Sequence, residues 1–168
     1  MSLTPVRTIA RILQLLWTVL IIALVGNMIA TATAGNPSIV NYDMFVAAFS
    51  ALSLFYLFPA AFRESFAIPD VVLLLDLANV LFWFCGAVAT AAYLGVHSCS
   101  SKSYTEHNKV TNGSKDTHKR CTEAQASTAF LWFGFACYVV TLFIAVKARG
   151  NINMRGSSVG RSSAMSQV

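Results

Sequence analysis

Two polar residues, Asp76 and Asn79, lie inside a long apolar stretch that runs from Pro69 to His97. About 20 apolar residues are enough to cross a bilayer as a helix, at about 1.5 Å per residue. A carboxyl group in the hydrocarbon costs about 2.5–3.5 kcal/mol on insertion scales, so it needs a partner, a proton or a cavity. Asp76 is therefore the first candidate for a functional residue, and we expect it to be the only acidic residue deep in the membrane.

Three interpretations of Asp76 follow. It could bind a proton or a cation in a transporter, it could be a protonated or hydrogen-bonded structural residue joined to Asn79 and a polar group of an earlier span, or it could be shallow enough to meet interfacial water. Arg11 is placed before the first apolar run, so no Lys or Arg is expected inside a span to neutralise Asp76. A conduction path normally needs more polar lining than one Asp and one Asn. We favour the structural role, with a small proton- or solute-linked transporter or channel as the alternative.

The second half of the same stretch carries small residues at four-residue spacing, namely Ala87, Ala91 and Gly95. Small residues at this spacing allow another helix to approach closely. The sequence therefore predicts a helix-packing face here.

The long polar segment of the chain is bracketed by Cys99 and Cys121. Cysteines at the mouths of two adjacent antiparallel helices can come close enough to form a disulfide, which would contribute about 3 kcal/mol and needs an oxidising compartment. Between them, Asn112 begins an N-x-S glycosylation sequon, whose alternative explanation is chance occurrence. Both features favour an extracytoplasmic loop.

No pattern for catalysis or metal binding is readable. Three histidines share the loop with the two cysteines, but their spacings match no zinc motif. The sequence has no Gly-rich phosphate loop and no defensible catalytic triad. We therefore predict a protein that is not an enzyme and has no catalytic residue, metal or cofactor.

Composition indicates an integral membrane protein. Of the 168 residues, 56% are hydrophobic and only 11% are charged, where about 25% charged is usual for a soluble domain. Four apolar spans are expected, at about residues 9–32, 41–62, 69–96 and 122–147. The formal charge of +5 comes from basic residues near the ends of spans, which report topology and lipid contact, so no nucleic-acid partner is expected.

An even number of spans places both termini on one side of the membrane. The termini and the turn between spans two and three carry seven Lys or Arg against five in the other connections, which favours cytoplasmic termini. Residues 148–168 are rich in Gly, Ser and Arg and are predicted to form a disordered cytoplasmic tail. Serines that follow basic residues in this tail are candidate phosphorylation sites: Ser157, Ser158, Ser162 and Ser163.

The loop and its flanks resemble a known family. His97-Ser98-Cys99, Asn108-Lys109-Val110-Thr111, Arg120-Cys121-Thr122-Glu123 and Asp76-Leu77-Ala78-Asn79 are similar to the fungal non-classical export protein branch of the MARVEL-domain family. The resemblance covers essentially the whole chain. It implies an all-α, four-helix transmembrane bundle over residues 1–147, with a disulfide-closed extracellular loop between the third and fourth helices.

The same resemblance implies a function and a location. Members of this branch are linked to eisosomes, the furrow-like domains of the plasma membrane, to sphingolipid sensing and to secretion without a signal peptide. We therefore expect a non-enzymatic organiser of such domains. The expected partners are sphingolipid, sterol, further copies of the chain as a homo-oligomer, and eisosome scaffold proteins.

Overall fold

The structure is a computed structural model that describes residues 4–33 and 35–163, without the side chains of Glu64 and of residues 151–163. Its elements are helical: α1 (Thr4–Ala30), α2 (Ser38–Phe62), the short 3-10 helix η1 (Glu64–Phe66), α3 (Pro69–Leu94), α4 (Lys102–His107) and α5 (Thr117–Ser163). Helices α1, α2, α3 and residues 117–150 of α5 are each long and apolar enough to cross a membrane. The prediction of an all-α protein with four transmembrane helices is confirmed.

Proline and glycine mark the helix ends. Pro69 occupies the first turn of α3, where the missing N–H would have had no helical partner, and Pro37 directly precedes α2. Gly95 ends α3 with a φ of 64°, a conformation that favours glycine. Helices α2 and α3 therefore begin, and α3 ends, close to the membrane boundaries that the apolar pattern predicts.

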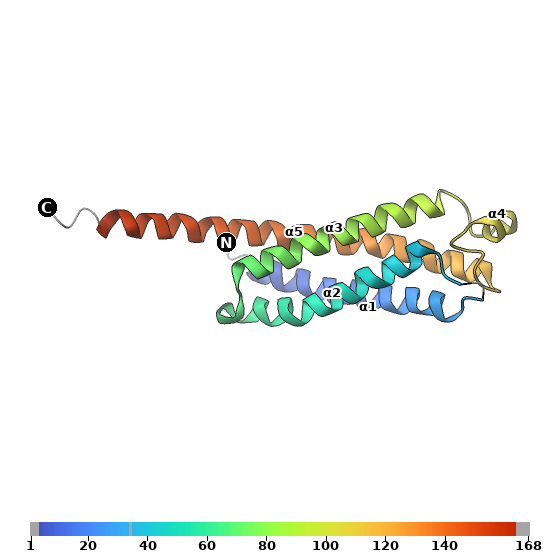
Figure 1. The fold of residues 1–168 in the computed structure, drawn as a ribbon, viewed down its shortest axis with the longest axis horizontal. Helices are drawn as coiled ribbons and strands as arrows, with labels where there is room; N and C mark the ends of the chain where they lie inside the picture. Colours follow the sequence, from blue (N-terminus) through green and yellow to red (C-terminus); the bar gives the residue numbers. More distant parts are fainter. Residues whose placement is uncertain (1–3, 34, 164–168) are drawn as a thin grey trace.

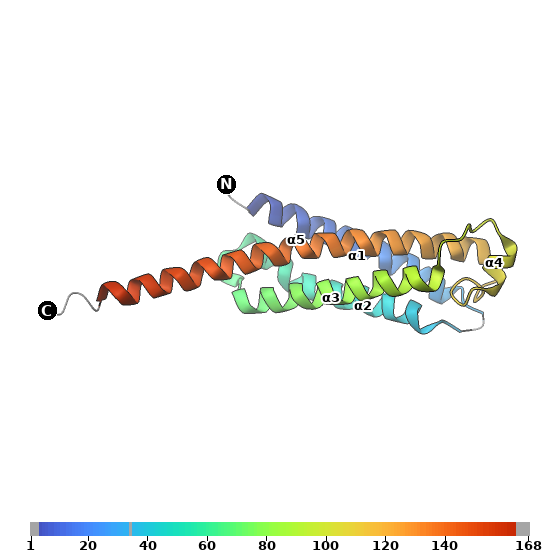
Figure 2. The same ribbon diagram turned by 90° about the horizontal axis from the view of Figure 1, so that it is seen from above.

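The four long helices form one antiparallel bundle (Figure 1). Helix α1 packs against α2 and α5, and α3 packs against the same two helices, so α1 and α3 lie diagonally opposite each other. Both termini lie at one end of the bundle, and α4 lies at the other end with the α1–α2 loop. Figure 2 shows α5 continuing beyond the other helices on the side of the termini.

The distribution of side chains is that of a membrane protein. Large apolar residues face outwards, and Phe55, Leu52 and Leu74 are 78%, 70% and 66% exposed. The interior contains an apolar core around Ile21, Val46 and Leu131 together with many buried polar groups. These groups can be held only by one another, because the hydrocarbon offers no hydrogen bonds.

One close helix contact depends on a glycine. Trp83 of α3 is fully buried against Gly134 of α5, and a Cβ on Gly134 would lie 2.0 Å from the Trp83 ring. Only a residue without a side chain fits there. The sequence pattern of small residues pointed to α3 instead, and it did not identify this contact.

The tail differs from the expectation of disorder. Helix α5 runs on to Ser163, so residues 148–163 are helical, and residues 164–168 lie outside the described residues. Extending an existing helix avoids the costly nucleation step, which explains how a segment poor in large apolar residues can remain helical.

Candidate functional site: buried polar networks of the bundle

Asp76 forms an ion pair with Arg11 inside the bundle, in the half nearer the termini. The guanidinium of Arg11 donates from Nη1 to Oδ1 of Asp76 at 2.6 Å and from Nη2 to Oδ2 at 2.7 Å. The two residues are 1% and 0% exposed. The guanidinium and the carboxylate thus form a bidentate ion pair with two parallel hydrogen bonds, which is among the strongest contacts between two side chains.

The prediction that no basic residue lies inside a span is therefore wrong. Hydropathy places the beginning of the uninterrupted apolar run at Ile12, directly after Arg11, but the helix begins at Thr4, with Pro5 in its first turn. Arg11 consequently lies about two turns inside α1 and faces the bundle. The signal in the sequence that could have identified this partner is the position of Arg11 itself. A basic residue about two turns inside a helix can face the neighbouring helices of a bundle.

Two further side chains complete the inner network. Gln14 of α1 accepts a hydrogen bond from Nη1 of Arg11 at 2.9 Å and donates to Oγ1 of Thr141 at 3.0 Å. The Thr141 hydroxyl lies 3.1 Å from Oδ1 of Asp76, to which it can donate. The inner network, defined as Arg11, Gln14, Asp76 and Thr141, thus joins α1, α3 and α5.

A middle network follows one to two turns deeper in the bundle. Ser50 of α2 shares hydrogen bonds with Thr18 of α1 at 2.8 Å and with Tyr138 of α5. Asn79 of α3 donates to Ser53 at 2.9 Å and to the carbonyl oxygen of Leu75. Asn79 therefore bonds to α2 rather than to Asp76, and the middle network links all four long helices.

A second carboxylate, that of Asp43 on α2, is also buried inside the protein, near the end of the bundle opposite the termini. Asp43 is 3% exposed, and its Oδ2 accepts a hydrogen bond from Thr90 of α3 at 2.8 Å. Its Oδ1 has no hydrogen-bond partner among the described residues and faces Gly86. The position of Asp43 only five residues after Ser38, near the polar end of the span, concealed its burial.

The predicted small-residue face is only partly present. Ala87 is fully buried in the core, whereas Ala91 is half-buried. Gly95 is exposed and terminates α3, so its assignment to a helix-packing face is wrong. The spacing argument failed because it assumed that the helix continues past Leu94.

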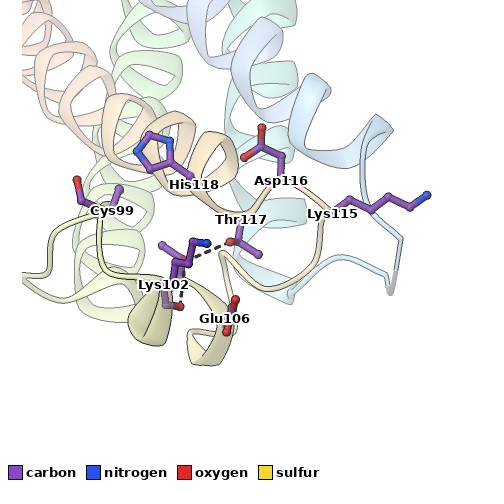
Figure 3. A pocket seen from close by; sticks show the side chains of 9 residues that line it. Cys99, Lys102, Glu106, Lys115, Asp116, Thr117 and His118 are labelled. Carbon is purple, nitrogen blue, oxygen red and sulfur yellow. Dashed lines mark hydrogen bonds between the residues drawn. The ribbon is translucent and has the colours of Figure 1, made fainter.

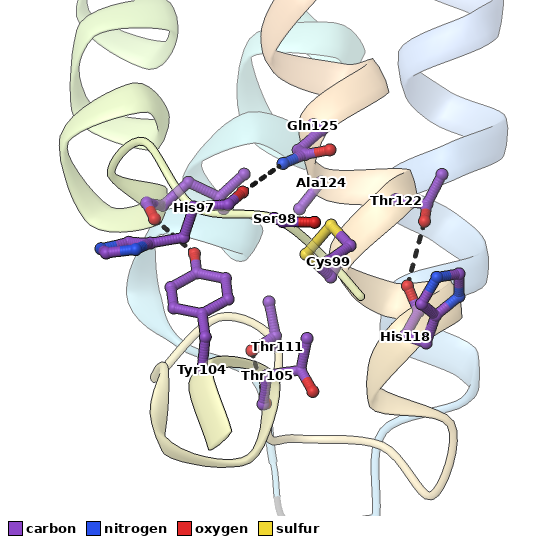
Figure 4. The surroundings of a disulfide bond; sticks show 12 residues. His97, Ser98, Cys99, Tyr104, Thr105, Thr111, His118, Thr122, Ala124 and Gln125 are labelled. Carbon is purple, nitrogen blue, oxygen red and sulfur yellow. Dashed lines mark hydrogen bonds between the residues drawn. A yellow bond between two sulfur atoms is a disulfide. The ribbon is translucent and has the colours of Figure 1, made fainter. Parts of the chain in front are cut away.

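The predicted disulfide is confirmed. Cys99 and Cys121 are bonded with a Cα–Cα distance of 5.7 Å, and they tie the segment after α3 to the first turns of α5 (Figure 4). Gln125 donates a hydrogen bond to the carbonyl oxygen of His97 at 3.0 Å beside the bridge. The loop is therefore closed both covalently and by hydrogen bonds.

Arg120, next to the bridge, is the second organiser of the outer cap, which we define as the α1–α2 loop and residues 95–121. It is 1% exposed and donates to the carbonyl oxygens of Val110 at 2.7 Å and Met28 at 2.6 Å, and to Oδ1 of Asn36 at 2.9 Å. One side chain thus joins α1, the α1–α2 loop and the long loop. Sequence reasoning counted Arg120 only as a loop charge.

The outer cap also contains an open cavity of about 570 Å³ (Figure 3). Its lining carries both signs of charge, including Lys102 and Lys115 against Glu106 and Asp116. Within the part of the chain that the structure describes, no three His, Cys, Asp or Glu residues gather in a way that could hold a metal ion. The cavity resembles a hydrated surface recess more than a built ligand site.

Two groups of predicted modification sites stay predictions. Asn112 is exposed on the outer cap, in keeping with an accessible sequon. The side chains of the four tail serines, Ser157, Ser158, Ser162 and Ser163, lie outside the described residues.

Comparison with known proteins gives consistent matches. Residues 3–144 match the family model of MARVEL, the membrane-associating domain. The chain is 33% identical to non-classical export protein 2 homolog 1 of Saccharomyces cerevisiae over 155 residues, which cover 92% of this chain and 86% of that protein. It is 36% identical to non-classical export protein 2 of the same yeast over 82% of this chain and 78% of that protein. It is 37% identical to non-classical export protein 102 of Candida albicans, over 82% and 81% of the two chains. No solved structure matches the chain significantly.

Proposed function

Because the chain belongs to the MARVEL family of membrane-associating domains, we propose that it is a non-enzymatic organiser of plasma-membrane domains that responds to sphingolipid. It assembles laterally with further copies of itself and with eisosome scaffold proteins, in contact with sphingolipid and sterol. The names of its relatives refer to non-classical export, and we extend this link to unconventional secretion by this chain.

The observation that carries the proposal is the division of the bundle into a polar inside and an apolar outside. The charges of Arg11 and Asp76 neutralise each other, and the neighbouring hydroxyl and amide groups bond among themselves. The outer surface of the described spans is left with large apolar side chains. Such a surface can contact lipid tails and other transmembrane helices, and these are the contacts that an organiser uses.

The orientation follows from the disulfide. A Cys99–Cys121 bridge forms in an oxidising compartment, and it lies at the end of the bundle opposite the termini. We therefore orient the outer cap to the extracellular side and both termini to the cytoplasm, in agreement with the distribution of Lys and Arg. Labelling of single cysteines introduced at residues 2 and 116 in intact cells would test this orientation.

Sphingolipid acts in this proposal by binding one assembly state better than another. A ligand shifts an equilibrium only through its differential affinity for the two states, and a difference of about 1.4 kcal/mol changes the association constant about tenfold. The test is energy transfer between labelled copies in bilayers of defined composition. We expect association to change when sphingolipid is removed, and an unchanged association constant would refute the mechanism.

The alternative function is a small transporter centred on Asp76. The same chain, reconstituted in bilayers of defined composition, distinguishes this transporter from the organiser. In the structure, both carboxylate oxygens of Asp76 are bonded to Arg11, so neither is left for a transported cation. We expect sealed vesicles to show no proton or solute flux above that of empty vesicles. A flux that Asp76→Asn abolishes would favour the transporter instead.

A further inference from the structure

An apolar groove lies between α1 and α2 on the membrane-facing surface, in the half of the bundle near the termini. It has a volume of about 310 Å³. Phe55 and Leu15 are 78% and 43% exposed, so the groove opens towards the hydrocarbon, and the small side chain of Ala51 leaves space between larger neighbours. Its full lining is Leu15, Ala51, Leu54, Phe55, Phe58 and Pro59.

Arg7 lies on the same α1–α2 seam, nearer the termini. It donates from Nη2 to the carbonyl oxygen of Ala61 at 2.8 Å, and its Nε is buried without a hydrogen-bond partner among the described residues. Eight residues separate Arg7 from Leu15, which is about 12 Å along the helix. The cation and the apolar groove therefore follow each other along the membrane normal. The headgroup and the acyl chain of a lipid follow each other in the same way.

The other basic residues near this end differ from Arg7. Arg149 pairs with Asp70 at 3.2 Å, and Lys147 lies over the ring of Phe143. In the part of the chain described with side chains, which omits Glu64, no carboxylate lies within ion-pair distance of Arg7 or of the exposed Arg63 that follows α2. Arg7 therefore brings to the seam a positive charge that the described side chains do not neutralise.

We propose that this seam binds one anionic phospholipid of the leaflet on the side of the termini. Arg7 binds its phosphate, and one acyl chain occupies the groove beside Ala51. The inference deepens the lipid-responsive function by naming a lipid class and a site. The site itself does not depend on the proposed orientation of the chain. Only the identification of that leaflet as the cytoplasmic one rests on that orientation.

The test uses the full chain in bilayer discs of phosphatidylcholine with trace amounts of a lipid that carries a spin label on its acyl chain. Electron paramagnetic resonance then gives the motionally restricted fraction for labelled phosphatidylserine and for labelled phosphatidylcholine. One basic contact near a membrane surface changes an association constant about fivefold. We expect Arg7→Gln to lower the preference for phosphatidylserine by about this factor, and Ala51→Phe to lower the restricted fraction by filling the groove.

Matched controls lie away from the α1–α2 seam, on α5. Arg149→Gln removes a cation at the same end, and Ala136→Phe fills the groove between α1 and α5, which also has a volume of about 310 Å³. Neither control is expected to change phosphatidylserine binding at the seam. If Arg149→Gln lowers the preference as much as Arg7→Gln, general surface charge explains the binding and the proposal is refuted.

Folding is checked by the intact disulfide and the unfolding midpoint of each variant. Where Arg7→Gln does not fold, Arg7→Lys serves as the second variant. It retains the charge and is expected to retain the preference for phosphatidylserine. Folded Arg7→Gln and Ala51→Phe proteins with wild-type lipid selectivity would overturn the site. This readout does not depend on self-association, so its failure leaves the sphingolipid experiment standing, and the reverse also holds.

Discussion

The ion pair between Arg11 and Asp76 makes the most quantitative prediction. Asp76→Asn keeps the shape of the side chain but removes its charge, so the buried guanidinium loses its counter-charge. The two hydrogen bonds of 2.6 and 2.7 Å are charge-assisted, and each such bond is worth about 1.5–3 kcal/mol. Removal of one member of a buried pair typically costs about 3–5 kcal/mol, which we adopt as the expected loss in free energy of unfolding.

A double-mutant cycle isolates the interaction itself. Arg11→Gln should cost about as much as Asp76→Asn, because it leaves the carboxylate buried without a cation. The double variant, with two neutral amides in place of two charges, should recover at least half of the loss. The two single losses sum to at least about 6 kcal/mol, so recovery of half of that sum corresponds to a coupling energy of at least about 3 kcal/mol.

The assay is unfolding of the purified chain in mixed micelles with increasing denaturing detergent, followed by helix content. Asp70→Asn is the matched control, because it changes a carboxylate of the same helix whose side chain is 71% exposed and which pairs with Arg149 at 3.2 Å. That surface pair should contribute less than about 1 kcal/mol. Additive single losses, or an Asp76→Asn loss no larger than that of Asp70→Asn, would refute the reasoning.

Three further predictions concern other contacts. Gly134→Ala should destabilise the bundle by about 3 kcal/mol, because its Cβ would lie 2.0 Å from the Trp83 ring, while Gly150→Ala, with open space around it, should be neutral or stabilising in the same unfolding assay. Arg120→Lys should cost about 2–3 kcal/mol, because an ammonium cannot reach all three acceptors, whereas Lys119→Ala at the neighbouring exposed position should change stability by less than about 0.5 kcal/mol. Cys99→Ser with Cys121→Ser should lower stability by about 3 kcal/mol and abolish the effect of reductant on the unfolding midpoint; a variant that still responds to reductant would contradict the assignment of the bridge.

The transmembrane fold could be predicted from the sequence because it depends on local properties. Apolar length predicts a span directly, and Pro69 and the turn signals around Pro37 separate one span from the next. The bridge between Cys99 and Cys121 was predictable for a related reason, since antiparallel neighbours place their ends together. These inferences need no knowledge of how the helices rotate about their axes.

The candidate site was predicted only in part, because its partners depend on helix rotation and pairing. Asp76 could be singled out by its apolar surroundings, but its partner Arg11 lies 65 residues away and on the diagonally opposite helix. Arg11 was also concealed because it directly precedes the apolar run that begins at Ile12, and hydropathy locates where the chain becomes apolar, not where the helix begins. The contact of Gly134 with Trp83 likewise depends on the approach of two particular helices.

The two buried carboxylates show why pairing, more than burial, determines the role of an acidic residue in this bundle. Asp76 and Asp43 are 0% and 3% exposed, so burial alone would rank them together. Asp76 is held by a guanidinium that reaches across the bundle from α1, and a different rotation of either helix would separate two charges in hydrocarbon. Asp43 has only the Thr90 hydroxyl as a hydrogen-bond partner among the described residues, so a change in its surroundings would forfeit one neutral donor. The inner pair therefore specifies how the helices are arranged, because the charge of Asp76 is compensated by a cation of another helix, which the described residues do not offer to Asp43.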